Sequence, residues 1–291
     1  MITHSQDAQA PPTLQCMEIW GGIDAVDTAL SLTGLDAWVY ARPHADGHAG
    51  GDVHYLSMCG SGRIVRLGLA DVSGHGVKVA DVADTLRTLM RKHINTPDMT
   101  RFMRALNGAF VEHTQEGPGS GHFATAILAT YYAPTDHLLL CNAGHPRPLW
   151  WRASTNQWSV LDESSPELAD KVANLPLGVI EPTPYSQFAV RLDKRDLVLI
   201  FTDGLEETRS PDGAMLGQQG LLNMLASLDA SRPEALTHAL LDRLAEFRGR
   251  NAGAEDDLSI ILLHHNAAGP HRQSIGELAG VLAKMIGLKK V

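Results

Sequence analysis

The sequence RIVRLGLADVSGHG, residues 63–76, contains a strand-like run that ends on an aspartate and continues into a glycine-rich turn. Its first half alternates polar and apolar residues and then becomes fully apolar, which is typical of a strand that enters a hydrophobic core. Asp71 stands where that strand ends, and Gly74 and Gly76 allow the sharp turn that a following helix requires. The stretch therefore predicts a unit that delivers one carboxylate, and the main-chain carbonyl of Val72, to the same point.

Four other short stretches, far apart in the chain, combine polar residues with glycine or a β-rich run. They are Gly50-Gly51-Asp52, Asn142-Ala143-Gly144-His145, Phe201-Thr202-Asp203-Gly204 and Glu255-Asp256-Asp257-Leu258-Ser259. No stretch of the five has a serine or cysteine nucleophile in an elbow turn. Carboxylates delivered from strand ends to one place suit a hard divalent cation, because Mg²⁺ and Mn²⁺ take oxygen ligands. The leading hypothesis is a metal-dependent hydrolase of phosphate esters.

Converging carboxylates would oppose folding in the absence of cations. Two like charges about 4 Å apart repel by roughly 1 kcal/mol in water and about 4 kcal/mol at an effective dielectric of 20. Divalent ions would remove that penalty, so we expect metal binding to be coupled to stability.

Each stretch also has an ordinary interpretation when it is taken alone. Gly50-Gly51-Asp52 is typical of a simple turn, and Asp256-Asp257 is typical of a solvated cap before a strand. In that pair, one carboxylate can bind metal while its neighbour stabilises the turn. A histidine after a strand, such as His145, is usually structural or exposed.

The composition narrows the class of protein. Hydrophobic residues make up 44% of the 291 positions, enough for a substantial core, and the formal charge of -9 provides no basic field for nucleic acid or anionic lipid. The three cysteines share no metal-type spacing, and their odd number argues against a disulfide framework. The N-terminus lacks the regions of a signal peptide, and no apolar stretch reaches the roughly 20 residues that cross a bilayer. We expect a soluble, cytoplasmic protein.

The coarse pattern of strands and helices favours an α+β sandwich of antiparallel sheets. Residues 1 to about 15 are predicted to be disordered, and Trp38-Val39-Tyr40 to begin the first strand, followed by a flexible turn at 43–50. Helices are predicted at 77–94, from 97–98 onward, at 218–228 and at 233–247. Strands are predicted as a hairpin at 123–132 and 137–141, as a second pair at 188–192 and 197–202, and as a single strand at 258–263.

The chain is expected to divide into a disordered segment (1–17), one domain (18–266) and a linker with a terminal amphipathic helix (267–291). Ile275, Leu278, Leu282, Met285 and Ile286 would share one face of that helix. The preferred interpretation is a helix docked on its own domain. A homodimer or partner contact is the main alternative, and binding to a membrane surface is a weaker one.

Read together and in order, the motifs resemble those of the metal-dependent protein phosphatases (PPM, the phosphatase 2C type), in particular the bacterial SpoIIE-like branch. The resemblance covers about residues 35–265. Its most specific elements are Ala70-Asp71-Val72-Ser73-Gly74-His75-Gly76, Cys141-Asn142-Ala143-Gly144-His145-Pro146, Phe201-Thr202-Asp203-Gly204-Leu205-Glu206-Glu207, Ser210-Pro211-Asp212-Gly213-Ala214-Met215-Leu216-Gly217 and Asp256-Asp257-Leu258-Ser259.

The resemblance implies an αββα sandwich with a two-metal site at one edge of the stacked sheets. By motif position, the ligands of two Mn²⁺ or Mg²⁺ ions would be Asp52, Asp71, the carbonyl of Val72, Asp203 and Asp256, with Asp71 bridging both ions. The implied activity is hydrolysis of phosphoserine or phosphothreonine on a partner protein by water that the two ions activate. The implied partner is a phosphorylated antagonist of an anti-sigma factor or a related signalling protein.

Further roles and departures follow from the same resemblance. His75 is a candidate to protonate the leaving oxygen, although a solvent-contacting residue at a helix start is the simpler interpretation, and a structural role is preferred for His145. The family usually has aromatics and a second aspartate after Gly-Gly-Asp, whereas this chain has Val53-His54-Tyr55. His54 would replace that aspartate as a ligand or, as we prefer, be an exposed strand residue. Arg42 is the candidate for gripping phosphate.

Two functional alternatives remain. The missing second aspartate would suit a pseudophosphatase that binds phosphoproteins without hydrolysing them. A two-metal phosphoesterase acting on nucleotides or nucleic acid is disfavoured by the acidic balance and by the lack of a basic cluster with interleaved aromatics. Only about 35 residues precede the first predicted strand, too few for a sensor domain. We therefore expect control to come from a separate chain, from the termini or from metal supply.

Overall fold

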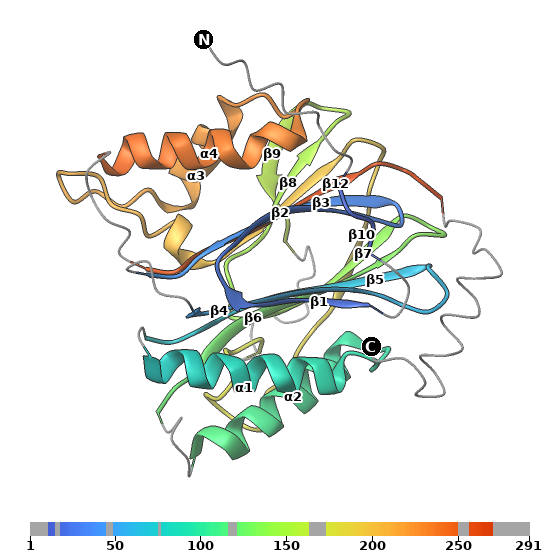
Figure 1. Cartoon of the computed structure of the whole chain (residues 1–291), viewed down its shortest axis with the longest axis vertical. Coiled ribbons are helices and arrows are strands. Elements are labelled where there is room, and N and C mark those ends of the chain that lie inside the picture. Colours follow the sequence, from blue (N-terminus) through green and yellow to red (C-terminus); the bar gives the residue numbers. More distant parts are fainter. Residues whose placement is uncertain are drawn as a thin grey trace, which may run out of the picture.

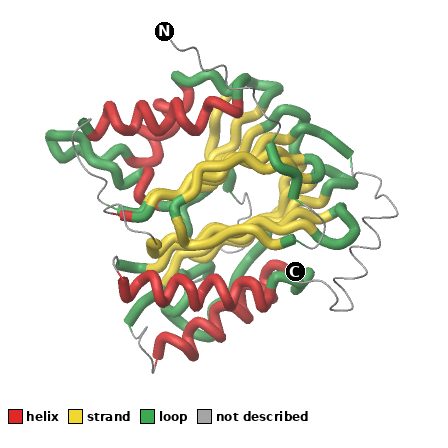
Figure 2. Tube along the Cα trace, viewed as in Figure 1, coloured by secondary structure: helices red, strands yellow, loops and turns green. Residues whose placement is uncertain are grey.

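The computed structural model describes residues 11–14, 18–44, 49–74, 77–115, 121–162, 173–249 and 256–269. Within them, two six-stranded sheets stack face to face, and a pair of helices covers the outer face of each (Figures 1 and 2). Every strand pair in both sheets is antiparallel. The predicted αββα sandwich of the α+β class is confirmed.

The first sheet carries the glycine-rich turn that follows Asp71. In spatial order its strands are β1 (Ile19–Asp24), β4 (Ala49–Met58), β5 (Ile64–Val72), β6 (Ala124–Tyr132), β7 (His137–Ala143) and β10 (Phe188–Arg191). Helices α1 (Val77–His93) and α2 (Met99–Gln115) cover its outer face through buried residues such as Leu86, Phe102 and Phe110. Asp98 caps α2, since its Oδ1 accepts a hydrogen bond from the Arg101 N–H at 2.9 Å.

The second sheet carries the motifs at Asp203 and Asp256. In spatial order its strands are β2 (Val26–Leu32), β3 (Leu35–Arg42), β12 (Leu258–His265), β11 (Leu197–Phe201), β8 (Leu149–Arg152) and β9 (Gln157–Val160). Helices α3 (Gly217–Ala226) and α4 (Pro233–Arg248) pack on its outer face through residues such as Leu221 and Leu240. A 3₁₀ turn, η3 (Asp203–Leu205), follows β11 directly.

The central core lies between the two sheets and decides where the strand-end aspartates point. On β5, Leu67 and Leu69 belong to this core, whereas Ala70 and Val72 face the helices. Successive side chains of a strand point to opposite faces, so Asp71 faces the other sheet with the two leucines. At the end of β5 that carries Asp71, the space between the two sheets is therefore lined by carboxylates rather than by apolar residues.

Several expectations about the strands were wrong. Trp38-Val39-Tyr40 does not begin the first strand, because β1 and β2 precede it, and β4 already starts within the predicted turn at 43–50. The runs 188–192 and 197–202 do not pair with each other, since β10 adds to β7 in one sheet and β11 joins β8 and β12 in the other. The four predicted helices and the hairpin of β6 and β7 are confirmed.

The ends of the chain are only partly described. Within the predicted disordered segment, residues 11–14 pack against β2: the Leu14 N–H donates to the Ser31 carbonyl at 3.0 Å, and Leu14 is buried. That part of the prediction is therefore wrong. The predicted helix in 267–291 lies almost wholly outside the described residues. Among the helices that are described, none has the length and apolar character of a membrane-crossing segment.

Candidate metal centre

The predicted carboxylates come together at one end of the two sheets. Asp52 on β4 lies directly opposite Asp71 on β5, so their side chains share the face that points toward the second sheet. From that second sheet, Asp203 follows the end of β11 and Asp256 precedes the start of β12, two strands that pair along their length. Four acidic residues, up to 204 positions apart in the chain, thus converge from both layers.

The raised pKa values of these carboxyl groups reflect their burial and their closeness to one another. Burial raises the pKa of Asp71 to about 8, and the charges of Asp203 and Asp256 add to the rise. The pKa of Asp203 is raised to about 6, first by burial and then by Asp256 and Glu207. The pKa of Asp52 is raised well above its ordinary value by burial, followed by the charge of Asp71. Without cations, the ionised form of these carboxyl groups is strongly disfavoured.

The turn after Asp71 is fixed by contacts with the start of β6. Ser73 donates its N–H to the Phe123 carbonyl at 2.8 Å, and the Phe123 N–H donates to Ser73 Oγ at 3.0 Å. Gly74 adopts a positive φ of 99° that a residue with a side chain would rarely take. A Cβ on Gly51 would lie 2.9 Å from the Val72 carbonyl oxygen. The bare strand at Gly51 therefore leaves room beside the Val72 carbonyl.

The two neighbouring aspartates before β12 have different surroundings. Asp257 is buried, and its two carboxylate oxygens accept hydrogen bonds from the backbone N–H groups of His44 and Gly51, each at 2.5 Å. A Cβ on Gly50 would come within 2.5 Å of that carboxylate. Asp257 thus holds the start of β4 from the opposite sheet. Asp256 instead lines the adjoining cleft.

A hydroxyl from the second sheet supports Asp52. Thr202 is fully buried at the end of β11, and its Oγ1 donates to Asp52 Oδ2 at 2.9 Å. The same Oγ1 accepts the Ser259 N–H at 2.9 Å. Motif reasoning treated Thr202 only as a part of the Thr-Asp-Gly stretch and missed this contact. A polar residue that continues the inward-facing pattern of β11 was the available signal.

His145 is a buried structural residue beside the carboxylates. The Asn142 side chain makes two hydrogen bonds to the His145 backbone. Its Oδ1 accepts from the His145 N–H at 2.7 Å, and its Nδ2 donates to the His145 carbonyl at 2.9 Å. Its Nδ1 lies 2.9 Å from Thr125 Oγ1, and Thr125 is the residue opposite Asp71 on β6. Burial lowers the pKa of His145 to about 3. A ring that stays neutral at physiological pH agrees with the preferred structural role.

His54 is buried rather than exposed, on the same face of β4 as Asp52. Its side chain is 3% exposed, its ring centroid lies 5.5 Å from that of Trp20 on β1, and burial lowers its pKa to about 4. The expectation of exposure was wrong because β4 is covered on both faces, by the second sheet and by α1. The charge of Asp24, on the neighbouring strand β1, acts on the pKa of His54 in the opposite direction to burial.

The two remaining site candidates differ in how far the structure describes them. Arg42 is the last residue of β3 and lies opposite Leu258 on β12. It is therefore at the same end of the second sheet as Asp256, and its side chain is half-buried. His75 lies outside the described residues, and its role stays a prediction.

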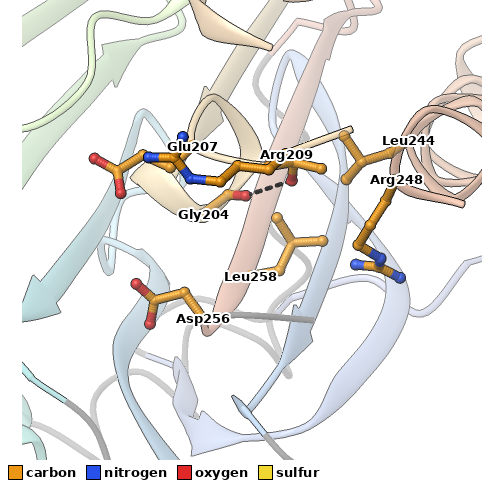
Figure 3. Close-up of a pocket in the computed structure, with 8 residues that line it drawn as sticks. Gly204, Glu207, Arg209, Leu244, Arg248, Asp256 and Leu258 are labelled. Carbon is orange, nitrogen blue, oxygen red and sulfur yellow. Dashed lines mark hydrogen bonds between the residues drawn. The ribbon is translucent and has the colours of Figure 1, made fainter. Parts of the chain in front are cut away.

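A cleft of about 230 Å³ opens beside the carboxylates, between η3 and the end of α4 (Figure 3). It is lined by Gly204, Glu207, Thr208, Arg209, Leu244, Arg248, Asp256 and Leu258. Figure 3 shows Asp256 and Glu207 on one side and Arg248, from α4, on the other. Neither Arg209 nor Arg248 could be predicted from the sequence, since neither belongs to a motif and their positions are 39 residues apart.

The donors present fit a hard divalent cation better than a soft one. They are carboxylate and carbonyl oxygens, and the described residues bring no cysteine among them. Asp52 Oδ1 is buried without a hydrogen bond of good geometry, with only the Ser259 side chain near enough to act on the carboxylate, so one acceptor can still take a ligand. In the described part of the chain, no group of three His, Cys, Asp or Glu side chains is already arranged to hold a metal ion. Mg²⁺ does not require such a group, because it keeps several waters and binds through one or two carboxylates.

Comparison with known proteins identifies the class of this molecule. The solved PP2C phosphatase domain of SpoIIE from Bacillus subtilis superposes with a TM-score of 0.63 at 15% identity, covering 86% of this chain and 64% of that one. The RsbU and RsbW domains of Rv1364c from Mycobacterium tuberculosis give a TM-score of 0.66 at 24% identity, with the same coverage of 86% and 64%. The fold is therefore that of PP2C-type phosphatase domains.

The family follows from the sequence match. The family model described as Stage II sporulation protein E (SpoIIE) matches residues 61–266, and the chain belongs to this family. Phosphoserine phosphatase RsbU of Bacillus subtilis is 22% identical over 200 residues, which are 68% of this chain and 55% of RsbU. The chain thus spans little more than half the length of that relative. The resemblance inferred from the motifs is confirmed at the level of the family.

Proposed function

We propose that this protein is a metal-dependent protein serine/threonine phosphatase that uses two Mn²⁺ or Mg²⁺ ions. The observation that carries the proposal is the convergence of Asp52, Asp71, Asp203 and Asp256 from two sheets, with pKa values raised for the three that show a resolved shift. Membership of the SpoIIE family and the similarity to a named phosphoserine phosphatase support the same activity. RsbX, a neighbour with a TM-score of 0.57 at 16% identity, has been solved in complex with magnesium.

The residues would divide the work as follows. Asp52, Asp71, Asp203 and Asp256 would hold the ions through carboxylate oxygens, and Val72 would add its carbonyl. When bound, the ions supply positive charge that activates water and neutralises the phosphoryl oxygens. Glu207, on the cleft wall, adds negative charge that favours cation binding. Arg42 is proposed to contact the phosphate, and His75 to protonate the leaving oxygen of the serine or threonine.

The partner is proposed to be a phosphorylated protein of the anti-sigma factor antagonist type. RsbU is named as a phosphoserine phosphatase, and the Rv1364c neighbour contains an RsbU domain together with an RsbW domain. Neither of the two described cysteines, Cys59 and Cys141, forms a disulfide, which supports the cytoplasmic location proposed from composition. A pull-down with the Asp203→Asn variant, probed for phosphorylated partners, would identify the substrate.

The activity is tested with the purified chain, p-nitrophenyl phosphate and a phosphoserine peptide. Hydrolysis is expected with Mn²⁺ or Mg²⁺, abolished by EDTA and reduced about 1000-fold by Asp203→Asn, because several kcal/mol of charge stabilisation depend on the ions. Asp212→Asn, in an exposed turn of the same loop, is the matched control and should retain full activity. Wild-type protein that stays inert on both substrates in excess Mn²⁺ would contradict the proposal.

A phosphoprotein-binding pseudophosphatase is the alternative. The residue that stands near the family's second aspartate is His54, a buried imidazole that packs against Trp20 and offers no carboxylate. Calorimetric counting of Mn²⁺ separates the two functions, since an inactive binder should hold fewer than two ions tightly.

A further inference from the structure

Asp52 has two oxygens in different situations. Its side chain is 5% exposed, and its Oδ2 accepts the Thr202 hydroxyl from the opposite sheet. Its Oδ1 is buried and has no partner within good hydrogen-bond geometry, although the Ser259 side chain lies near enough to Asp52 to oppose the rise in its pKa that burial causes. A buried oxygen without a partner is costly in a folded protein, unless a ligand takes the position.

The direction of the Thr202 contact is fixed by its second partner. Thr202 Oγ1 accepts the Ser259 N–H at 2.9 Å, and a backbone N–H can only donate. The single hydroxyl hydrogen of Thr202 is therefore available for Asp52 Oδ2. Oδ2 is thus held from the opposite sheet, and Oδ1 is the oxygen of Asp52 that is left to bind another group.

The same few atoms also connect the two sheets. Asp52 belongs to β4 in the first sheet, and Thr202 and Ser259 belong to the ends of β11 and β12 in the second. The Thr202 N–H donates in addition to the Ser259 carbonyl at 3.0 Å, which holds the threonine backbone in place. The hydroxyl is thus delivered by a rigid strand pair rather than by a loop.

We propose that Thr202 is a positioning residue for the metal centre: by binding Asp52 Oδ2, its hydroxyl directs Asp52 Oδ1 toward the cation. This inference rests on the proposed two-metal function and adds a specific determinant of cation affinity. Partners that orient a metal ligand change affinity or activity by about 10- to 100-fold when removed. Thr202 acts through Asp52 and has no contact with substrate in this scheme.

Two substitutions separate positioning from packing. Thr202→Val removes the hydroxyl and keeps the branched shape, whereas Thr202→Ser keeps the hydroxyl and removes the methyl group. A role in positioning predicts that the valine variant is impaired and the serine variant is close to wild type. A role in packing alone predicts the reverse order.

The main experiment titrates Mn²⁺ into the full chain by calorimetry. Thr202→Val is expected to bind one Mn²⁺ about 10- to 100-fold more weakly, and to need correspondingly more Mn²⁺ for half-maximal hydrolysis of p-nitrophenyl phosphate, with a smaller change in kcat at saturation. Thr202→Ser should stay within about 3-fold of wild type. Urea unfolding in EDTA verifies that both variants are folded.

The outcomes are distinct. Unchanged Mn²⁺ affinity in Thr202→Val, or equal losses in both variants, would overturn the positioning role while an active wild type leaves the proposed function intact. A wild type that binds no Mn²⁺ would overturn both. If Thr202→Val does not fold, Thr202→Ala takes its place in a double-mutant cycle with Asp52→Asn. The threonine substitution should then have no further effect on Mn²⁺ affinity, because the oriented carboxylate is already absent. Full additivity in that cycle would refute the inference.

Discussion

At Asp71, burial and the charges of Asp203 and Asp256 act in the same direction, and they raise its pKa to about 8. The residue lies opposite Asp52 on the neighbouring strand, which is itself buried and accepts a hydrogen bond only on one oxygen. Without cations, this position holds a carboxyl group that either stays protonated or is ionised at a cost to the fold. Asp71, the residue on which the proposed chemistry depends most, therefore destabilises the metal-free protein.

Replacing Asp71 with asparagine should separate stability from activity. Asp71→Asn keeps the shape and removes the charge, so we expect the free energy of unfolding of the metal-free protein at pH 8 to rise by about 2 kcal/mol. Hydrolysis of p-nitrophenyl phosphate with Mn²⁺ should fall about 1000-fold, since a proposed metal ligand is lost. Urea unfolding in EDTA and steady-state kinetics measure the two effects. Asp242→Asn, exposed on α4, is the control and should change neither. A metal-free variant less stable than wild type would show that repulsion is not the dominant effect at this position.

At the scale of elements, the first residues of β4 depend on glycine. A Cβ on Gly51 would lie 2.9 Å from both the Val72 carbonyl oxygen and Val79 Cγ1, where β4 meets β5 and α1. Gly51→Ala should therefore destabilise the protein by about 1 to 3 kcal/mol and weaken Mn²⁺ binding, because the Val72 carbonyl must move. Thermal unfolding and calorimetry measure these effects. Gly22→Ala on β1 is the matched control, since the nearest atom to its Cβ is a side-chain oxygen 3.5 Å away. Equal effects of the two substitutions would indicate a general loss of strand flexibility.

The sequence predicted the helices and the strand-end motifs because each depends on local pattern. The stripe of α1, the Asp98 cap of α2 and the apolar run of β5 before Asp71 are all readable within one element. Pairing between strands is not local. The turn between β10 and β11 looked like a hairpin, but Asp196 is buried there and accepts the Trp150 Nε1–H and the Ala153 N–H from the β8 side. Those contacts direct β11 into the second sheet.

The candidate site was predicted in its acidic residues but not in its supports. Asp52, Asp71, Asp203 and Asp256 carry motif signals, and the structure brings them to one end of the sandwich. Thr202 binds Asp52 from 150 positions away, and His54 is buried on the face of β4 that points to the second sheet, beside Trp20. Both facts depend on the stacking of two sheets, which no single-strand pattern contains.

At the scale of the whole molecule, pH and cations should act on stability together. For Asp71 the folded pKa, about 8, lies above the unfolded value near 4, so the folded state binds the extra proton between these limits. Stability is then full below about pH 4 and is lost as pH rises toward 8. His54 and His145 have folded pKa values lowered to about 4 and about 3, so they act in the opposite direction, with stability lost below about pH 6.5.

The window from pH 6.5 to 8 mainly reports on the carboxylates, because both histidines are neutral in the folded state there and at most half protonated in the unfolded state. Metal-free protein should lose stability across this window, by about 1 to 2 kcal/mol for each carboxyl group that stays protonated in the fold. Saturating Mg²⁺ should abolish the loss, since the bound carboxylates are ionised throughout. Urea unfolding at pH 6.5 and 8, with EDTA or with Mg²⁺, measures the difference. Parallel pH dependence under both conditions would contradict a cation site at these residues.

The antiparallel strand order also places one end of the molecule far from the candidate metal centre. The loops between β6 and β7 and between β10 and β11 lie at the ends of their strands farthest from Asp71 and Asp203, and Pro134, Thr135, Lys194 and Arg195 are exposed there. Exposed loop tips tolerate insertions best. Reporter tags or fluorescent fusions inserted between Pro134 and Thr135 should leave cation binding and turnover unchanged. This end of the molecule is therefore suited to imaging or immobilising the protein, while the end that carries the carboxylates stays accessible.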